Sequence, residues 1–74
     1  MRRHTAPWTD LDGNPIHEGD RIVLESGDSG IVMFFPDEQS DVERWSVDYG
    51  HGTVRSLSEE VSRAVVLDET GKYF

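Results

Sequence analysis

The shortness of its apolar stretches restricts the fold of this chain more than any other feature. Each stretch covers four to six residues and is followed by serine, proline, glycine or aspartate. The stretches are residues 21–25, 30–35, 44–49, 53–57 and 64–67. Eight valines and three isoleucines, against two alanines and four leucines, favour strands because β-branched side chains suit a pleated surface. We therefore expect five strands.

The connecting segments predict how these strands pair. Residues 26–29 suit a tight hairpin turn, and residues 50–52 suit a short turn between the third and fourth strands. Residues 36–43 contain a single apolar side chain, Val42, and are expected to form a longer, mobile loop. The strands should therefore pair in an antiparallel order.

A single helical turn is expected before the last strand. Ser58 is followed by Glu59 and Glu60, and a serine cap with acids in the first turn is typical of a helix N-terminus. Only about one turn fits before Ala64. The predicted fold class is all-β, with five antiparallel strands and one short helical turn.

Three motifs resemble a known family pattern. They are Ile16-x-x-Gly19-Asp20-Arg21-Ile22-Val23-Leu24, then Gly30-Ile31-Val32, then Trp45-Ser46-Val47-Asp48-Tyr49-Gly50. They resemble the "GD-x-V … G-x-V … W-x-V-x-F/Y-x-G" pattern of KOW-like and Tudor-like barrels. The chain is also similar to small bacterial proteins encoded beside polymorphic toxins. The resemblance implies a five-stranded SH3-like barrel, in which Gly30 lets its strand bend where a Cβ would crowd.

Alternation along the strands predicts which side chains form the core. The expected core faces consist of Ile22, Leu24, Val32, Phe34, Trp45, Val47, Val54 and Val66. The opposite face of the same strand then carries Ile31, Met33 and Phe35, whereas a barrel with one core would carry polar residues there. This second apolar set predicts an interface, either with a partner or between two copies of the chain.

The 74 residues form one domain at most, with room for one small core. We expect a flexible segment over residues 1–15, a barrel over 16–68 and a tail over 69–74. Trp8 and the pair Tyr73-Phe74 either fray with these ends or fold back onto the barrel. The chain contains no cysteine, no signal peptide and no apolar run long enough to span a membrane, which predicts a soluble, cytoplasmic protein.

The net charge of −8 argues against direct binding to nucleic acid or to anionic membranes. The charge is uneven, because residues 10–43 contain ten acids and one base, Arg21, which is a net −9. Residues 44–74 carry five acids and four bases, and Arg2 with Arg3 supply the remaining +2. A basic protein is the expected partner.

Catalytic and metal-binding patterns are weak. Gly27-Asp28-Ser29-Gly30 matches the residues around the nucleophile of trypsin-like proteases, but the remaining machinery is missing, so we interpret it as a hairpin turn. His4, His17 and His51 lack the short spacing that a zinc site prefers, and His17 and His51 are expected to be exposed loop residues. No metal, cofactor or enzymatic activity is predicted.

One loop concentrates carboxylates, namely Asp37, Glu38, Asp41 and Glu43. An EF-hand loop would need a glycine at its sixth position and a bidentate glutamate at its twelfth, and neither is present. The loop is therefore either a solvated segment or the docking site of an electropositive partner.

Aromatic residues leave a second alternative open. Trp45, Tyr49 and Phe34 either pack in the core or form a cage of the kind by which Tudor-like barrels hold methylated side chains.

Two functions follow from these expectations. The leading one is a non-enzymatic acidic module, an inhibitor or immunity-type protein of bacterial or phage origin that occupies a basic groove of its target. The alternative is a Tudor-like or KOW-like adaptor that binds a peptide or a larger complex. Either a monomer or a homodimer is compatible with the sequence.

Overall fold

The computed structural model describes residues 4–67. The described residues form seven strands and two short helical turns. The strands are β1 (Thr5–Thr9), β2 (Pro15–His17), β3 (Arg21–Leu24), β4 (Ser29–Phe34), β5 (Trp45–Gly50), β6 (Thr53–Ser56) and β7 (Ala64–Val66). The helical turns are α1 (Asp41–Arg44) and α2 (Leu57–Glu60). About half of the residues are in strands and 12% are in helices, so the all-β prediction is confirmed.

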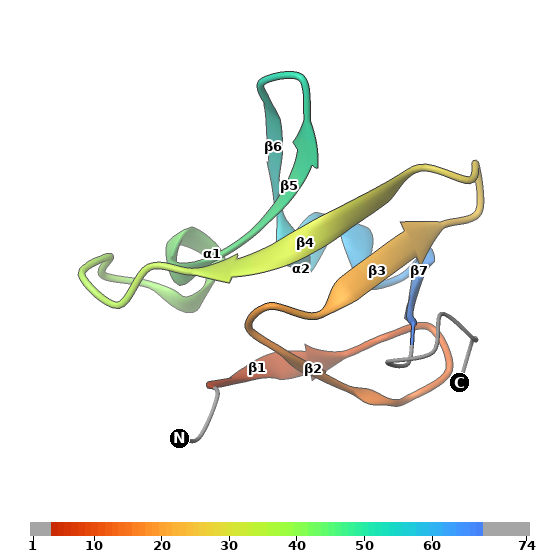
Figure 1. The fold of residues 1–74 in the computed structure, drawn as a ribbon. Helices are drawn as coiled ribbons and strands as arrows, with labels where there is room; N and C mark the ends of the chain where they lie inside the picture. The colour runs from red at the N-terminus through yellow and green to blue at the C-terminus, as the bar shows by residue number, and fades with distance from the viewer. Residues whose placement is uncertain (1–3, 68–74) are drawn as a thin grey trace.

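The five expected strands form one antiparallel sheet in the order β6-β5-β4-β3-β7 (Figure 1). Each of them lies within one residue of its expected bounds. The edge strands β6 and β7 pair with β5 and β3 respectively and not with each other. The sheet is therefore not closed, and the closed barrel implied by the resemblance is not seen.

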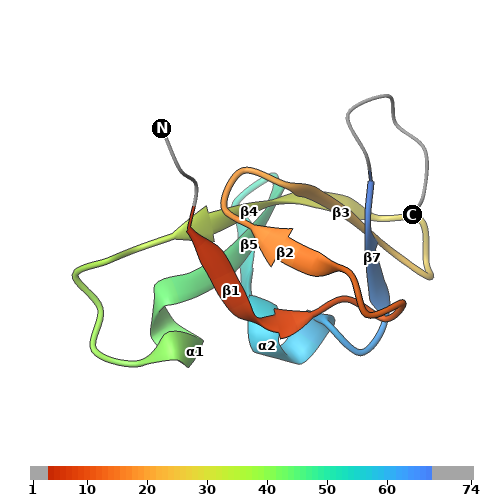
Figure 2. The same cartoon turned by 90° about the horizontal axis from the view of Figure 1, so that it is seen from below.

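A two-stranded hairpin, β1-β2, lies beneath the sheet and was not expected from the sequence (Figure 2). Its strands pair antiparallel, with Thr5 opposite His17 and Thr9 opposite Pro15. Ala6 and Ile16 are buried in the same core as the sheet residues, and Trp8 packs against it. Residues 5–9 are thus folded back onto the domain, which is the second of the two alternatives given above for Trp8. Tyr73 and Phe74 lie outside the described residues.

Asp10 joins this hairpin to the edge of the main sheet. Its buried carboxylate accepts hydrogen bonds from the backbone N–H groups of Asp12 (2.9 Å) and Asn14 (2.8 Å) through Oδ1, and of Val66 (2.9 Å) through Oδ2. The N–H of Leu11 donates to the carbonyl of Ala64 at 2.9 Å. Charge-assisted hydrogen bonds of this kind are the strong ones in proteins. They pair the backbone N–H of Val66 and the carbonyl of Ala64 at the outer edge of β7, which an open sheet would otherwise leave unpaired.

The core confirms most of the predicted faces. Buried apolar side chains come from every strand except β6 and also include a residue of α2: Ala6, Ile16, Ile22, Val23, Val32, Trp45, Val47, Leu57, Ala64 and Val66. Leu24 and Phe34 are partly buried against them. Val54 was predicted wrongly, because it is 52% exposed. Its partner in the β5-β6 register is Asp48, on the outer face, whereas Arg55 pairs with the buried Val47.

Gly30 confirms the expected crowding. A Cβ at this position would lie 2.6 Å from Val47 Cγ1 and 2.9 Å from both the Asp48 carbonyl oxygen and Tyr49 Cδ1. The close approach of β4 to β5 therefore requires glycine.

The helical turns differ from expectation in two details. The turn α2 occurs where predicted, but its N-cap is Ser56 rather than Ser58. The expected loop 36–43 contains the start of α1, which Ser40 caps. Ser40 Oγ accepts from the Glu43 N–H at 3.3 Å and donates to Glu43 Oε1 at 2.9 Å, so the N-cap side chain contacts both the backbone and the side chain of Glu43.

In the described part of the chain, the helices are too short and too polar to cross a membrane.

Candidate functional site

The outer face of the sheet, away from the core, brings together residues from several strands. The strand registers place Arg21, Ile31, Asp48 and Val54 side by side in one row across β3, β4, β5 and β6. The next row contains Met33, Ser46 and Ser56. Alternate residues of a strand share a face, so both rows lie on the same side of the sheet.

Apolar side chains are exposed on and around these rows. Ile31 and Val54 are exposed on either side of Asp48, and Met33 is half-buried beside them. Phe35, 41% exposed, follows directly after β4. Val42 of α1 is also exposed, and its carbonyl accepts a 3.2 Å hydrogen bond from Ser56 Oγ, which places α1 beside the second row.

Carboxylates border this apolar set. They belong to Asp48 in the first row, to Asp37 and Glu38 in the loop after Phe35, and to Asp41 and Glu43 in α1. Two arginines lie near them. Arg21 occupies the first row, and Arg44 donates from Nε to the Glu38 carbonyl at 2.8 Å and has Nη1 3.8 Å from Asp41 Oδ1. We call these apolar and acidic residues together the acidic–apolar face.

The predicted partner-binding residues lie on β4, in the loop that follows it and in α1. Ile31 and Met33 share the outer face of β4, and Phe35 and the four carboxylates follow them in the loop after β4 and in α1. The structure adds Val54, Val42 and Asp48, which the sequence analysis did not assign to this site. The N-cap Ser40 gives the acidic loop a defined end at α1.

The three aromatics proposed for a cage lie in two separate places. Trp45 is 2% exposed, and its ring centroid is 4.8 Å from that of Phe34. The imidazole ring of His4 stacks on the ring of Phe34, with 4.2 Å between the two ring centroids. Tyr49 is four residues further along β5 and lines a cavity that neither Phe34 nor Trp45 reaches.

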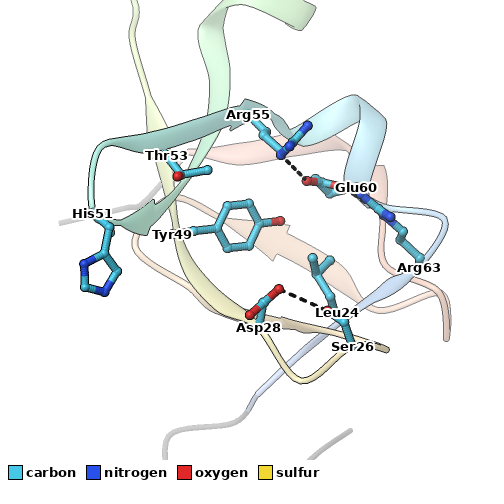
Figure 3. A pocket seen from close by; sticks show the side chains of 10 residues that line it. Leu24, Ser26, Asp28, Tyr49, His51, Thr53, Arg55, Glu60 and Arg63 are labelled. Carbon is cyan, nitrogen blue, oxygen red and sulfur yellow. Dashed lines mark hydrogen bonds and ion pairs between the residues drawn. The ribbon is translucent and has the colours of Figure 1, made fainter.

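That cavity lies on the inner side of the sheet and has a volume of about 380 Å³ (Figure 3). Its walls come from the turn between β3 and β4, the turn between β5 and β6, β6 itself, and the end of α2. The lining residues are Leu24, Ser26, Asp28, Tyr49, Gly50, His51, Thr53, Arg55, Glu60 and Arg63.

Glu60 is the only fully buried charged residue among residues 4–67, with an exposed fraction of 0%. Its Oε2 accepts hydrogen bonds from Arg63 Nε at 3.0 Å and Nη2 at 2.8 Å. Arg55 Nε lies 3.9 Å from Oε1, too far for a hydrogen bond. Within the described part of the chain, neither Glu60 Oε1 nor the buried hydroxyl of Tyr49 has a partner at full hydrogen-bond geometry, but the hydroxyl is directed toward Glu60 (Figure 3), and a weak Tyr49–Glu60 interaction contributes to the raised pKa of Tyr49.

The environment of Tyr49 raises the pKa of its hydroxyl above the ordinary value. Burial is the largest cause, and the negative charge of Glu60 acts in the same direction. Contact with Glu60 is also the main reason why the pKa of the Arg63 guanidinium is raised. The cavity floor therefore holds a neutral phenol and an ionised arginine at neutral pH.

The remaining candidates have ordinary structural roles. Gly27 and Asp28 lie in the turn between β3 and β4, where the N–H of Gly27 donates to the Leu24 carbonyl at 2.9 Å, and Ser29 and Gly30 begin β4. His51 is exposed, whereas His17 is partly buried with Nδ1 3.5 Å from Asp20 Oδ2, and His4 Nδ1 is 2.8 Å from Glu18 Oε1. Across residues 4–67, no group of three or more histidine or acidic side chains is arranged to hold a metal ion.

None of the protein-family models, curated proteins or solved structures compared with this chain matches it.

Proposed function

We propose that this chain is a non-enzymatic protein-binding module whose acidic–apolar face docks onto a basic surface of a partner protein, as an inhibitor or immunity-type protein does. The observations that support it are the exposed apolar side chains on the outer face of β4 and β6 and the carboxylates of Asp48 and of the loop and turn that follow β4. Five acids border that face against two arginines, and Phe35 and Val54 stand exposed among them.

The two components of this face have different physical roles. Carboxylates guide a basic partner during encounter, because long-range attraction raises the association rate and is screened by salt. Exposed apolar side chains hold the complex once water is excluded, and they therefore govern dissociation. We further propose an SH3-like arrangement for β3 to β7, which the order of the strands, the long loop between β4 and β5, and the turn α2 before β7 support.

The first test addresses the charges. A pull-down from the native cell supplies the partner, and association is then measured at low and high salt. The test variant replaces Asp37, Glu38, Asp41 and Glu43 by their amides, which keep side-chain size. We expect slower association and a weaker salt dependence than in the unmodified protein. The control replaces Asp12, Glu25, Asp28 and Glu59, four exposed acids outside this face, and changes the net charge equally.

The second test addresses the apolar component. Phe35→Ala should speed dissociation about tenfold or more, as loss of a central aromatic anchor does. Leu11→Ala removes an exposed apolar side chain near β7, outside the acidic–apolar face, and should change dissociation little. An acidic partner, or equal slowing of association by both quadruple variants, would contradict the proposal and favour the adaptor function.

A further inference from the structure

The two edge strands of the main sheet differ in what covers them. At β7, the N–H of Val66 donates to Asp10 Oδ2 and the carbonyl of Ala64 accepts from the N–H of Leu11, both at 2.9 Å. Within residues 4–67, β5 is the only strand that pairs with β6. Figure 1 shows the β5-β6 hairpin extending away from the rest of the sheet, with β6 along its free side. One edge of the sheet is therefore covered, and the other is open.

The hydrogen bonds of β4 determine which way the backbone of β5 points. In an antiparallel ladder, the N–H and C=O of successive residues point alternately to the two sides of the strand. The N–H of Val32 donates to Asp20 and its carbonyl accepts from Gly19, both at 2.8 Å. These two residues precede β3, so the polar groups of Val32 point away from β5. Val47 lies opposite Val32 and therefore directs its own N–H and C=O toward β6.

Alternation along β6 then leaves the backbone of Val54 directed outward. Arg55 pairs with Val47, so the N–H and C=O of Arg55 complete the β5-β6 ladder, and those of the preceding residue, Val54, point away from β5. Among residues 4–67, no backbone group of a turn or loop bonds to Val54. Val54 is also 52% exposed. An outward donor and acceptor on an exposed edge strand form a template for one further strand.

The outer face beside β6 determines which side chains such a strand should carry. Residues opposite each other in a ladder share a face, so alternate side chains of an added strand would lie next to Val54 and Ser56. Asp48 lies on the other side of Val54. Ser56 Oγ donates to the Val42 carbonyl at 3.2 Å, which places α1 and its two carboxylates at the Ser56 end of β6. An apolar side chain at Val54, flanked by cations, would complement this face.

The inner face excludes a uniformly basic segment. Arg55 lies there, with Nε 3.9 Å from Oε1 of the buried Glu60, and its side chain is 57% exposed. A cation directly opposite Arg55 would meet a like charge, which destabilises a cross-strand pair. The added strand should therefore alternate, with cations and an apolar residue on the outer face and uncharged β-branched residues on the inner face.

A second copy of the chain fits this edge poorly. The outer-face residues of β6 itself are Val54 and Ser56, so a paired copy would bring no cation to the carboxylates there. Each copy also carries a net charge of −8, and edge-to-edge pairing would hold two acidic molecules together. A basic partner avoids both costs.

We propose that β6 accepts an extended segment of the basic partner as a sixth strand of the main sheet, hydrogen-bonded to the backbone N–H and C=O of Val54. The basic character of this segment rests on the proposed function, whereas its docking at β6 follows from the sheet geometry. Main-chain hydrogen bonds give such an added strand its affinity, and its alternate side chains give specificity.

A short peptide tests the edge without the partner. The full ¹⁵N-labelled chain is titrated with acetyl-Thr-Lys-Thr-Val-Thr-Lys-Thr-amide at pH 7, and we expect saturable shifts of the Val54 and Ser56 amide signals. Exchange of the Val54 amide hydrogen with water should slow about tenfold when nine tenths of the chain is bound, since only the unbound chain exchanges. The Arg55 amide, which pairs with β5 throughout, is the internal control.

Two control peptides separate the backbone contribution from the charges. Methylation of the central valine nitrogen removes the donor that faces the Val54 carbonyl and should weaken binding about tenfold or more. Replacement of both lysines by glutamate keeps every backbone group and should also weaken binding, because the added charges then match those of the outer face. Added salt should weaken the lysine peptide and not the glutamate peptide.

Val54→Pro removes the outward N–H from the protein. This N–H does not contribute to the β5-β6 ladder, and an edge strand accepts proline where its N–H side faces solvent, so the fold should persist, which a thermal melt checks. Val54→Ala is the matched control, because it also removes the exposed side chain but keeps the N–H. Peptide binding should be about tenfold or more weaker in Val54→Pro than in Val54→Ala. If Val54→Pro is unfolded, the methylated peptide still tests the same pairing.

Several results would overturn the proposal. One is the absence of saturable shifts at millimolar peptide, and another is an unchanged exchange rate of the Val54 amide in the bound chain. Equal binding of the methylated peptide, or by folded Val54→Pro and Val54→Ala, would show that the peptide docks elsewhere. A dimer in sedimentation that Val54→Pro dissociates would assign the edge to a second copy of the chain.

The partner from the pull-down separates failure at this edge from failure of the proposed function. If only the edge docking is wrong, the partner binds Val54→Pro and Val54→Ala equally and still associates slowly with the quadruple amide variant. If only the acidic–apolar face is wrong, the quadruple amide variant associates normally, whereas Val54→Pro binds the partner more weakly than Val54→Ala.

Discussion

Gly30 shows at the scale of one residue how closely β4 and β5 approach. Its absent Cβ would lie 2.6 Å from a Val47 methyl group and 2.9 Å from the backbone oxygen of Asp48. We expect Gly30→Ala to destabilise the protein by about 1–3 kcal/mol, the usual cost of overpacking a core, because the backbone atom cannot move aside. Urea denaturation measures this cost.

Gly27→Ala provides the matched comparison. Gly27 has a φ of 97°, and a Cβ there would meet nothing within 4 Å, so its substitution adds strain without a clash. Its cost should be about 1 kcal/mol. An equal or smaller cost for Gly30→Ala would mean that β4 and β5 are further apart than described.

Tyr49 predicts a pH dependence of stability. Burial, and then Glu60, raise the pKa of its hydroxyl in the folded state above that of an unfolded tyrosine, about 10. The folded state therefore retains its proton where the unfolded state loses it. The stabilisation is fully present below pH 10 and is lost as the pH rises toward the higher folded-state pKa.

The measurement compares the unfolding free energy at pH 9 and pH 11. It should fall more steeply in the unmodified protein than in Tyr49→Phe, which has no hydroxyl to ionise. Parallel curves for the two proteins would show that the Tyr49 hydroxyl is not in a desolvated, negative environment.

Strands β2 and β6 have opposite relations to the core. Ile16 of β2 is 1% exposed, whereas Val54 of β6 is about half exposed. We expect Ile16→Ala to cost about 2–5 kcal/mol, as removal of a buried branched side chain does, and Val54→Ala to change stability by less than about 0.5 kcal/mol. Thermal or urea denaturation measures both. A small effect of Ile16→Ala would mean that the β1-β2 hairpin is not part of the folded core.

The elements differ in how far the sequence predicts them. Strands β3, β4, β5, β6 and β7 are each marked by an apolar stretch and a following turn residue, so their positions are predictable. The β1-β2 hairpin is not, because Pro7 lies within one of its strands and Pro15 begins the other, and proline is unfavourable in most strand positions. Its turn did carry a signal, the Asp12-Gly13 pair, which favours hairpins. Ser40 and Glu43 likewise have capping-box spacing and could have indicated α1.

The candidate sites were predictable only in part. The acidic loop and the set Ile31, Met33 and Phe35 follow from composition and from alternation within one strand. Val54 could not be placed correctly, because its face depends on the register of β5 with β6 and on the irregularity between Asp48 and Gly50. The cavity depends on tertiary contacts, since Tyr49, Arg55 and Glu60 come from β5, β6 and α2.

For the molecule as a whole, charge is the property with the broadest consequence. Residues 10–43 carry a net −9, and most of this charge is exposed. The buried Asp10 is an exception, because three backbone N–H groups bind it. Like charges held close together in the folded state repel one another more than in the extended unfolded chain. The unmodified protein should therefore become more stable when salt is added.

Asp37 and Glu38 test where this repulsion is concentrated. Both are exposed, and within residues 4–67 their carboxylates make no hydrogen bond or ion pair, unlike Asp41 and Glu43. Replacing them by Asn and Gln should raise the unfolding free energy by about 0.5 kcal/mol at 20 mM NaCl, as removal of neighbouring like charges does, and less at 500 mM NaCl, where added ions screen the repulsion. Urea denaturation at pH 7 measures both values. A double variant that is less stable than the unmodified protein at low salt would show that these carboxylates have attractive partners. The acidic–apolar face would then lack the repulsion between carboxylates that a basic partner could relieve.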